Sequence, residues 1–236
     1  MGVLIITKNR AIMAQTHTHF TTARQSMIDS QIHPMGVTSE RLLSAFAQVP
    51  REEFVPDNMR GICYCDEDIE IAENRFLLEP SVMARMIEQA KPSKQDVALT
   101  IGSGIGYSAA ILSSLVSTVI ALEENQDLVA QAQKAWDNND YVNIVGVQGA
   151  LNLGWAKNAP YDLIIINGAV ADIPEAIKQQ LSVGGRIIAP IKPANEAVAK
   201  VTYVKRVNED NFSDIVLFDS GTPYLQGFEP SKGFIF

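Results

Sequence analysis

Three glycines at alternate positions are the residues of this chain whose spacing suggests chemistry. Gly102, Gly104 and Gly106 follow the apolar run 97–101 and precede an apolar helix predicted over residues 109–115. Glycine lets the backbone turn sharply and approach a ligand where a Cβ would clash. The free N–H groups of the following helix suit an anionic or polar group. The alternative is a tight strand-to-helix turn without a ligand, and the spacing favours ligand binding.

The residue that follows the third glycine narrows the class of ligand. A dinucleotide-binding fingerprint needs Gly or Ala there for close packing of helix on strand, and this chain has Tyr107. An oxidoreductase with a nicotinamide cofactor is therefore disfavoured. The run 101–107 instead resembles the first motif of methyltransferases that depend on S-adenosylmethionine (SAM). This resemblance implies that Ser103 and Tyr107 join the three glycines around that cofactor.

Strands and helices alternate along the chain, which predicts an α/β fold with a mostly parallel sheet and helices on both faces. We expect strands at 118–122, 142–148, 161–166 and 186–190, helices through 128–136 and at 174–181, and an antiparallel pair at 200–207 and 214–220. Further upstream we expect helices at 22–31, at 39–48 behind an N-cap at Thr38, and from Pro80 onward, with an irregular region over 51–74.

Several polar residues are predicted to meet at one edge of this sheet. In such folds a ligand binds beyond the carboxyl ends of the strands, where the strand order reverses. Glu123 ends the second strand, about twenty residues after the first glycine, where a carboxylate suits ribose hydroxyls. Glu124 is also expected to contact the cofactor, and the alternative for Glu123 is a solvated charge beside Glu124. Gly149 and Ala150 follow the third strand and Asn167 follows the fourth, so they are expected at the same edge.

Composition excludes several other classes of protein. The net charge of −8 over 236 residues argues against a nucleic-acid partner, because phosphate binding needs a basic face. The apolar start, residues 1–7, is too short to span a bilayer. Cys63 and Cys65 form no disulfide framework, so we expect reduced thiols and a cytoplasmic location. The three histidines, His17, His19 and His33, lack the spacing of metal ligands, and no metal is expected.

An ordered set of segments resembles the protein-L-isoaspartate O-methyltransferase family. The set consists of Val49-Pro50-Arg51 with Phe54-Val55-Pro56, Tyr64-x-Asp66, Pro80-x-x-x-Ala84-x-Met86, Gly154-Trp155 with 159–162, Ile173-Pro174, and Leu181-x-x-Gly184-Gly185-Arg186. The resemblance covers residues 28–190 and implies a Rossmann-like class I methyltransferase that uses SAM. It also implies a monomer whose partner is a protein or peptide with isoaspartyl residues, or a related small acceptor.

The resemblance also implies a division of the chain and a substrate loop. Residues 1–21 are expected to be a flexible extension, 22–90 a helical and substrate-loop region packed on the core, and 91–236 the SAM-binding α/β domain. The family's loop reads Thr-Ile-Ser-Gln-Pro, and here Leu78 and Glu79 stand in place of the serine and the glutamine. Both occupy the expected catalytic positions. Glu79 disfavours an anionic acceptor by repulsion, but it is a possible general base for a hydroxyl or amine acceptor.

Two cofactor positions also depart from the family. The acid that contacts adenine is missing from Gly149-Ala150-Leu151, which leaves Asn152 as the nearest polar side chain, and Thr100 stands where an acid is common. One lost polar contact weakens binding by about 1–3 kcal/mol. Two hypotheses remain open: a SAM-dependent carboxyl methyltransferase, and a diverged member that binds SAM weakly or not at all and acts as a non-catalytic binding module. The first requires an open, nucleoside-shaped hollow that Glu123 faces.

Overall fold

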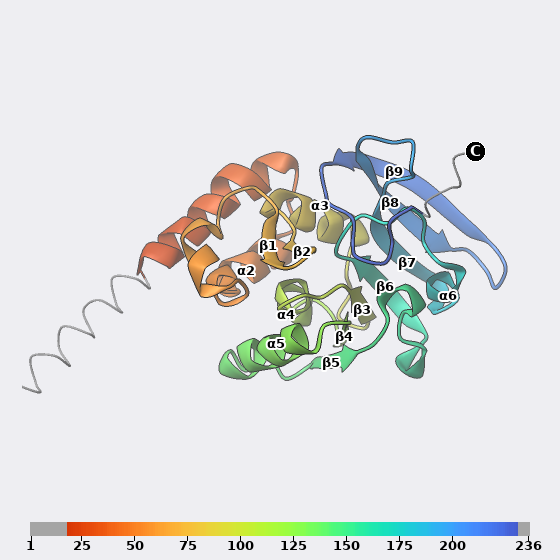
Figure 1. Cartoon of the computed structure of the whole chain (residues 1–236), viewed down its shortest axis with the longest axis horizontal. Coiled ribbons are helices and arrows are strands. Elements are labelled where there is room, and N and C mark those ends of the chain that lie inside the picture. The colour runs from red at the N-terminus through yellow and green to blue at the C-terminus, as the bar shows by residue number, and fades with distance from the viewer. Residues whose placement is uncertain (1–17, 231–236) are drawn as a thin grey trace, which may run out of the picture.

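In the computed structural model, which describes residues 18–230, a seven-stranded sheet forms the centre of the chain (Figure 1). The strands lie in the order β5-β4-β3-β6-β7-β8-β9. They are β3 (Val97–Ile101), β4 (Thr118–Glu123), β5 (Ile144–Gln148), β6 (Tyr161–Ile166), β7 (Leu181–Ile191), β8 (Ala199–Arg206) and β9 (Phe212–Ser220). β3 to β7 pair in parallel, and β8 and β9 pair antiparallel. The predicted mostly parallel sheet with a terminal antiparallel pair is confirmed.

The chain reverses its direction across the sheet between β3 and β6. It runs outward from β3 through β4 to β5 and then returns to the other side of β3 as β6, with Leu99 opposite Ile164. Both strands are buried almost throughout, as strands covered on two faces must be. The carboxyl ends of β3 and β6 therefore form the topological switch point, where open α/β sheets bind their ligands.

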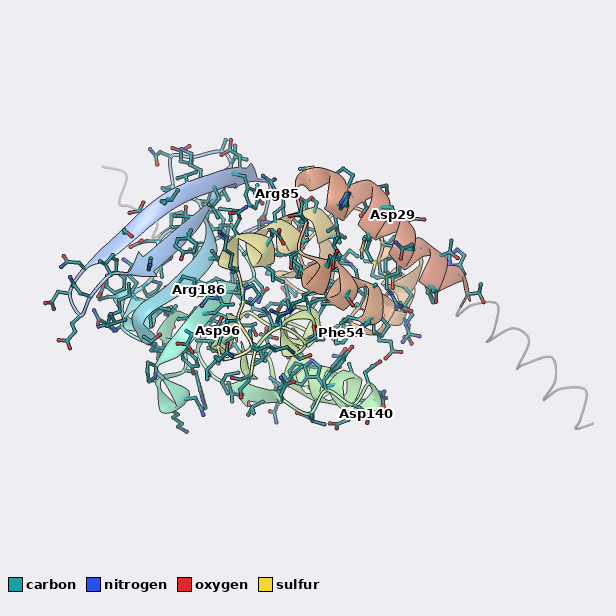
Figure 2. All side chains as sticks on the ribbon, turned by 180° about the vertical axis from the view of Figure 1, so that it is seen from behind. Asp29, Phe54, Arg85, Asp96, Asp140 and Arg186 are labelled. Atoms are coloured by element: carbon teal, nitrogen blue, oxygen red, sulfur yellow. The ribbon has the colours of Figure 1, made fainter. Side chains whose placement is uncertain are left out.

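The two faces of the sheet are covered unequally. The helices α3 (Pro80–Ala90), α4 (Tyr107–Ser113) and α5 (Gln126–Asn138) pack on one face, whereas the other carries the four-residue α6 (Glu175–Lys178) and short 3-10 turns. The helix predicted at 174–181 is shorter because Leu181 already pairs with Tyr161 as the start of β7. Arg85 of α3 stacks over Phe218 of β9 at 3.5 Å, and Figure 2 shows its side chain beside that strand.

The N-terminal region consists of helical segments and one hairpin. Residues 18–27 are α-helical and continue as a π-helix (Ile28–Ile32) and a 3-10 helix (His33–Met35). Residues 18–21 therefore belong to this helix and not to an extension; residues 1–17, with His17 and the apolar start, lie outside the described residues. α2 (Glu40–Gln48) begins after Ser39, whose hydroxyl accepts from Leu42 N, so Ser39 and not Thr38 is its N-cap.

The predicted irregular region contains structure that sequence reasoning missed. It holds two 3-10 helices, Arg51–Glu53 and Asp57–Ile62, and the strand β1 (Ile69–Ala72), which forms an antiparallel hairpin with β2 (Arg75–Leu77) directly after the region. The strands of this hairpin have only four and three residues, too few for a clear alternation of polar and apolar residues. The hairpin leads directly into the loop before α3, so it positions residues 78 and 79 (Figure 1).

Candidate functional site

The glycine turn follows β3 as predicted. Gly102, Gly104 and Gly106 have φ values of +69°, +58° and +92°, a region that glycine adopts without steric cost. α4 starts directly after the turn, two residues earlier than predicted, so Tyr107 is its first residue. The ring of Tyr107 is buried and lies under the guanidinium of Arg51 at 4.9 Å. Burial raises the pKa of Tyr107 to about 12, so this side chain is a neutral packing element of the turn.

Glu123 is buried and faces the glycine turn. It is 1% exposed, and its Oε2 accepts a hydrogen bond from Gly104 N at 2.9 Å. Its Oε1 accepts from the backbone N–H groups of Glu124 and Asn125 at 2.8 and 3.1 Å, and from Arg75 Nε at 3.1 Å. The alternative of a solvated charge is therefore wrong for Glu123. Glu124 is exposed and lies 3.9 Å from Arg75 Nη2.

Several buried polar atoms around the turn have no protein partner within the described part of the chain. Asn167 donates from Nδ2 to Ile101 O at 3.1 Å, but its Oδ1 has no partner. The hydroxyl of Ser103 is also unpaired. The further atoms of this kind near the turn are Thr100 Oγ1, Tyr107 OH, Ser108 Oγ and Arg75 Nη1. A buried polar group without a partner costs about 1–3 kcal/mol, so this concentration of them favours a ligand at the turn.

The space at the switch point is filled by the protein's own side chains. A Cβ at Gly102 would lie 2.6 Å from Leu225 Cδ1, and one at Gly168 would lie 2.7 Å from Leu225 Cβ. Leu225 therefore occupies the crevice between the ends of β3 and β6. Ile71 Cδ1 lies 2.5 Å from the place of a Gly104 Cβ. The cavity left between the turn and the loop after β2 is about 10 Å³, which is room for about one water molecule.

The residues after β5 lie at the same edge but are largely exposed. Gly149 packs against the ring of Trp155; a Cβ placed on Gly149 would lie 3.1 Å from Trp155 Cζ3. Ala150 and Asn152 are exposed to solvent. The side chain of Asn152 makes no hydrogen bond to any residue in the range 18–230, so no protein contact in that range orients it toward an adenine edge. The predicted positions are thus adjacent to the site, and their contact with a cofactor stays a prediction.

The loop after β2 presents Leu78 to the small cavity. The side chain of Leu78 is 1% exposed and lines the cavity together with Ser103 and Asn167. Its carbonyl accepts from Arg51 Nη2 at 2.8 Å, and Arg51 Nε donates to Cys63 O. Arg51 is fully buried, and burial lowers the pKa of its guanidinium. This arginine therefore ties the loop to the N-terminal region.

Glu79 occupies the N-cap position directly before α3 and lies close to the carboxylates of Asp66 and Asp68. Its N–H donates to Asp68 Oδ1 at 2.9 Å, and the N–H of Ser81 donates to Asp66 Oδ1 at 3.0 Å. Burial and the charges of Asp68 and Asp66 raise the pKa of Glu79 to about 7, against the opposing effect of Arg85. A carboxyl group with a pKa near neutrality is suited to general acid–base catalysis. Glu79 does not line the cavity, so its catalytic role stays a prediction.

Four residues of this site were missed by sequence reasoning or given no role there: Arg51, Ile71, Arg75 and Leu225. Arg51 lies in a motif that was noted only as part of a resemblance. Ile71 and Arg75 belong to the overlooked hairpin, and the alternation Ile69-Glu70-Ile71 before the turn at Asn74, with φ +55°, was its one local signal. Leu225 follows the last strand, and no local pattern connects it to a turn more than a hundred residues upstream.

Comparison with solved structures defines the class of protein. A protein-L-isoaspartate O-methyltransferase structure matches with a TM-score of 0.76 over 86% of this chain at 24% identity, and this chain spans 66% of its length. A structure from Plasmodium falciparum, assigned as a protein-L-isoaspartate O-methyltransferase in complex with S-adenosyl-L-homocysteine, matches with a TM-score of 0.72 over 88% of this chain and 98% of its own, at 16% identity. The fold is that of the class I methyltransferases.

Sequence comparison then gives the family. The model of the family described as Protein-L-isoaspartate(D-aspartate) O-methyltransferase (PCMT) matches residues 22–217. A protein-L-isoaspartate O-methyltransferase of Koribacter versatilis is 37% identical over 219 residues, 91% of this chain and 97% of that protein. One of Protochlamydia amoebophila is 36% identical over 186 residues, 79% of this chain and 88% of that protein. This chain belongs to the protein-L-isoaspartate O-methyltransferase family, as its motifs predicted.

The family implies SAM as the cofactor. The polar groups of the site are of the kinds that bind SAM, but the space left at the site is too small for it. The unpaired polar atoms of Ser103 and Asn167 and the carboxylate of Glu123 are of the kinds that an amino acid and a sugar bind. However, Leu225 and Ile71 cover the bare backbone of the turn, and the remaining cavity of about 10 Å³ cannot hold a nucleoside. The methyltransferase hypothesis requires an open hollow that Glu123 faces; Glu123 faces the glycine turn but does not line this small cavity.

Residues 18–230 contain neither a cluster of metal ligands nor a membrane-spanning helix. No group of three or more His, Cys, Asp or Glu side chains in this range is arranged to hold a metal ion. Among the helices of the same range, none has both the length and the apolar character that crossing a membrane requires.

Proposed function

We propose that this chain transfers a methyl group from SAM to the carboxyl group of an isoaspartyl residue in a protein or peptide, or to that of a related small acceptor. One observation carries the proposal: the buried carboxylate of Glu123 is bound to Gly104 N and so joins the end of β4 to the glycine turn. This arrangement supports a nucleoside site in a chain whose family carries the activity in its name.

Each part of the site has a role in this proposal. SAM supplies an activated methyl group when it is bound. Glu123 accepts from the sugar hydroxyls, and the turn 102–106 with Asn167 holds the amino-acid end. Leu78, which is tied by Arg51 to the N-terminal region, forms an apolar wall for the acceptor. A carboxylate acceptor is already ionised at neutral pH, so the task of these residues is alignment of the reactants.

The partners and location belong to the same proposal. The net charge of −8 supports a partner other than nucleic acid, and we propose that the chain acts as a monomer. Cys63 and Cys65 are free, and burial raises the pKa of the Cys63 thiol to about 12. Free cysteines support a reducing compartment such as the cytoplasm.

A second candidate is favoured by the filled crevice. A family member whose switch point is occupied by Leu225 could keep the fold and act as a non-catalytic binding module. Leu78 also supports this candidate, because an apolar side chain offers no hydrogen bond to a substrate carboxylate.

Methyl transfer to an isoaspartyl peptide separates the two candidates. We expect the wild-type protein to transfer labelled methyl groups to an isoaspartyl peptide in preference to the matched aspartyl peptide. Leu78→Ser is expected to raise the rate roughly tenfold, because one added hydrogen bond to a charged group contributes about 1.5 kcal/mol. Leu153→Ser is the control, since Leu153 is 61% exposed and does not line the cavity. Transfer by Leu78→Ser alone would favour the second candidate, and no transfer by either protein would contradict the proposal.

A further inference from the structure

One of the two carboxylate oxygens of Glu123, Oε1, is already fully occupied by protein donors. A carboxylate offers about four lone-pair positions. Glu124 N, Asn125 N and Arg75 Nε, the last at 3.1 Å, share Oε1, whereas Gly104 N is the donor to Oε2 among the described residues. The three backbone donors belong to the glycine turn and to the start of α5. The two neighbouring hydroxyls of a ribose can therefore bind both carboxylate oxygens only if the guanidinium of Arg75 leaves Oε1.

Arg75 is held at this place by little else. Its side chain is 4% exposed, and its Nη2 lies 3.9 Å from Glu124 Oε2, which is too far for a good hydrogen bond. Its Nη1 is buried without a protein partner. A buried guanidinium with unpaired N–H groups is an unfavourable arrangement. The position of Arg75 is therefore set mainly by Glu123, which is the group that a nucleoside would also bind.

The element that carries Arg75 also covers the glycine turn. β1 and β2 form a two-stranded sheet that is separate from the seven-stranded one, and an isolated hairpin has little stability of its own. Ile71 of β1 lies on Gly104, and β2 leads into Leu78. When the hairpin lifts, Arg75 and Ile71 leave the site together, and the loop that carries Leu78 must respond.

We infer that Arg75 is a specificity-determining residue that competes with the nucleoside for Glu123, so that a ligand binds only by displacing the guanidinium and lifting the β1–β2 hairpin. This inference rests on the proposed function, because it concerns the same nucleoside site. Arg75 restricts the site to ligands whose sugar hydroxyls and amino-acid end together replace the ion pair with Glu123.

Binding of S-adenosyl-L-homocysteine (SAH), measured without any turnover, tests this inference. The two tryptophans of the chain, Trp136 and Trp155, pack on Gly106 and Gly149, so their fluorescence reports directly on the site. We expect Arg75→Gln to bind SAH roughly tenfold more tightly than wild type, the effect of removing one competing charged hydrogen bond. Isothermal titration calorimetry of the same proteins gives the affinities independently.

Three further variants complete the experiment. The double variant Arg75→Gln/Glu123→Gln is not expected to bind SAH more tightly than wild type, because it lacks the carboxylate that accepts from the sugar hydroxyls. Arg60→Gln changes the net charge equally at a half-exposed position and is expected to bind as wild type does. Ile71→Ala leaves the ion pair intact but frees Gly104, and is expected to bind SAH more tightly than wild type. This last variant keeps the inference testable if Arg75→Gln does not fold.

The possible outcomes separate this inference from the proposed function. Equal SAH binding by wild type, Arg75→Gln and Ile71→Ala overturns the inference and leaves the proposed function intact. A gain in both variants without methyl transfer by any protein supports the inference and contradicts the proposed function. Absence of SAH binding in every variant overturns both, because removal of the competitor then does not create a nucleoside site.

Discussion

Two arginines at opposite edges of the sheet, Arg75 and Arg186, differ in how many of their N–H groups have hydrogen-bond partners. Arg186 lies at the amino ends of the strands beside Asp96, and Figure 2 shows the two labelled side chains together. It donates to Ala90 O, Asp162 O and Lys91 O at 2.7–3.0 Å and to Asp96 Oδ2 at 2.6 Å. Arg75, at the carboxyl ends, has one good hydrogen bond, to Glu123.

A more deeply buried arginine is expected to have more hydrogen-bond partners, and these two arginines show the opposite. The side chain of Arg75 is 4% exposed and that of Arg186 is 12% exposed, yet the more buried arginine has fewer partners. At the amino edge of the sheet one guanidinium thus joins β7 to the end of α3, to β6 and to Asp96 directly before β3. The carboxyl edge holds a charge pair whose members have unused bonding capacity, as expected where an external ligand competes with internal contacts.

The largest expected effect is on stability at the amino edge. Arg186→Ala removes four hydrogen bonds and leaves Asp96 with only the N–H of Ser93. Breaking a buried ion pair in this way costs about 3–5 kcal/mol of unfolding free energy, measured by urea denaturation. Lys200→Ala is the control, because the Lys200–Glu196 pair is exposed and such pairs contribute about 0–1 kcal/mol. Equal losses in the two variants would contradict the structural role of Arg186.

A smaller loss is expected at the carboxyl edge. Arg75→Ala leaves Glu123 with three backbone donors, so we expect a decrease of about 1–3 kcal/mol in the unfolding free energy, the contribution of one charged hydrogen bond. The same urea denaturation measures it. A loss as large as that of Arg186→Ala would remove the distinction between the two edges.

The smallest effect depends on pH and concerns Glu79. Its pKa is raised to about 7 by burial and by Asp68 and Asp66, with Glu67 adding to the effect and Arg85 opposing it. The folded protein therefore favours the protonated form. The stability from this group is fully present below the ordinary pKa of 4.5 and is lost as the pH rises through about 7.

Glu79→Gln should therefore gain in melting temperature relative to wild type as the pH is raised from 4.5 to 8. Glu70→Gln, at an exposed position on β1, serves as the control. A constant difference between wild type and Glu79→Gln across this range would show that Glu79 titrates normally.

Much of the central fold could be predicted from sequence because its signals are local. The apolar run 161–166 is β6 at the predicted bounds, and the glycines at 102, 104 and 106 adopt the turn that their lack of a Cβ permits. Glu123 ends β4 and faces the turn, since strand alternation and topology place it there. The family also follows from short motifs whose order along the chain is visible without a structure.

The remaining features depend on contacts between distant segments. The β1–β2 hairpin is too short for a periodic pattern, and it is stabilised by burial of Ile69 and Ile71 against the core. Arg75 and Glu123 are 48 residues apart, and Leu225 reaches Gly102 from beyond the last strand. The sequence by itself therefore determined the architecture and the ligand-binding turn, because backbone conformation and hydrophobic periodicity are local properties. Only the tertiary structure decided that the site is closed, because side chains from three separate segments pack into one space.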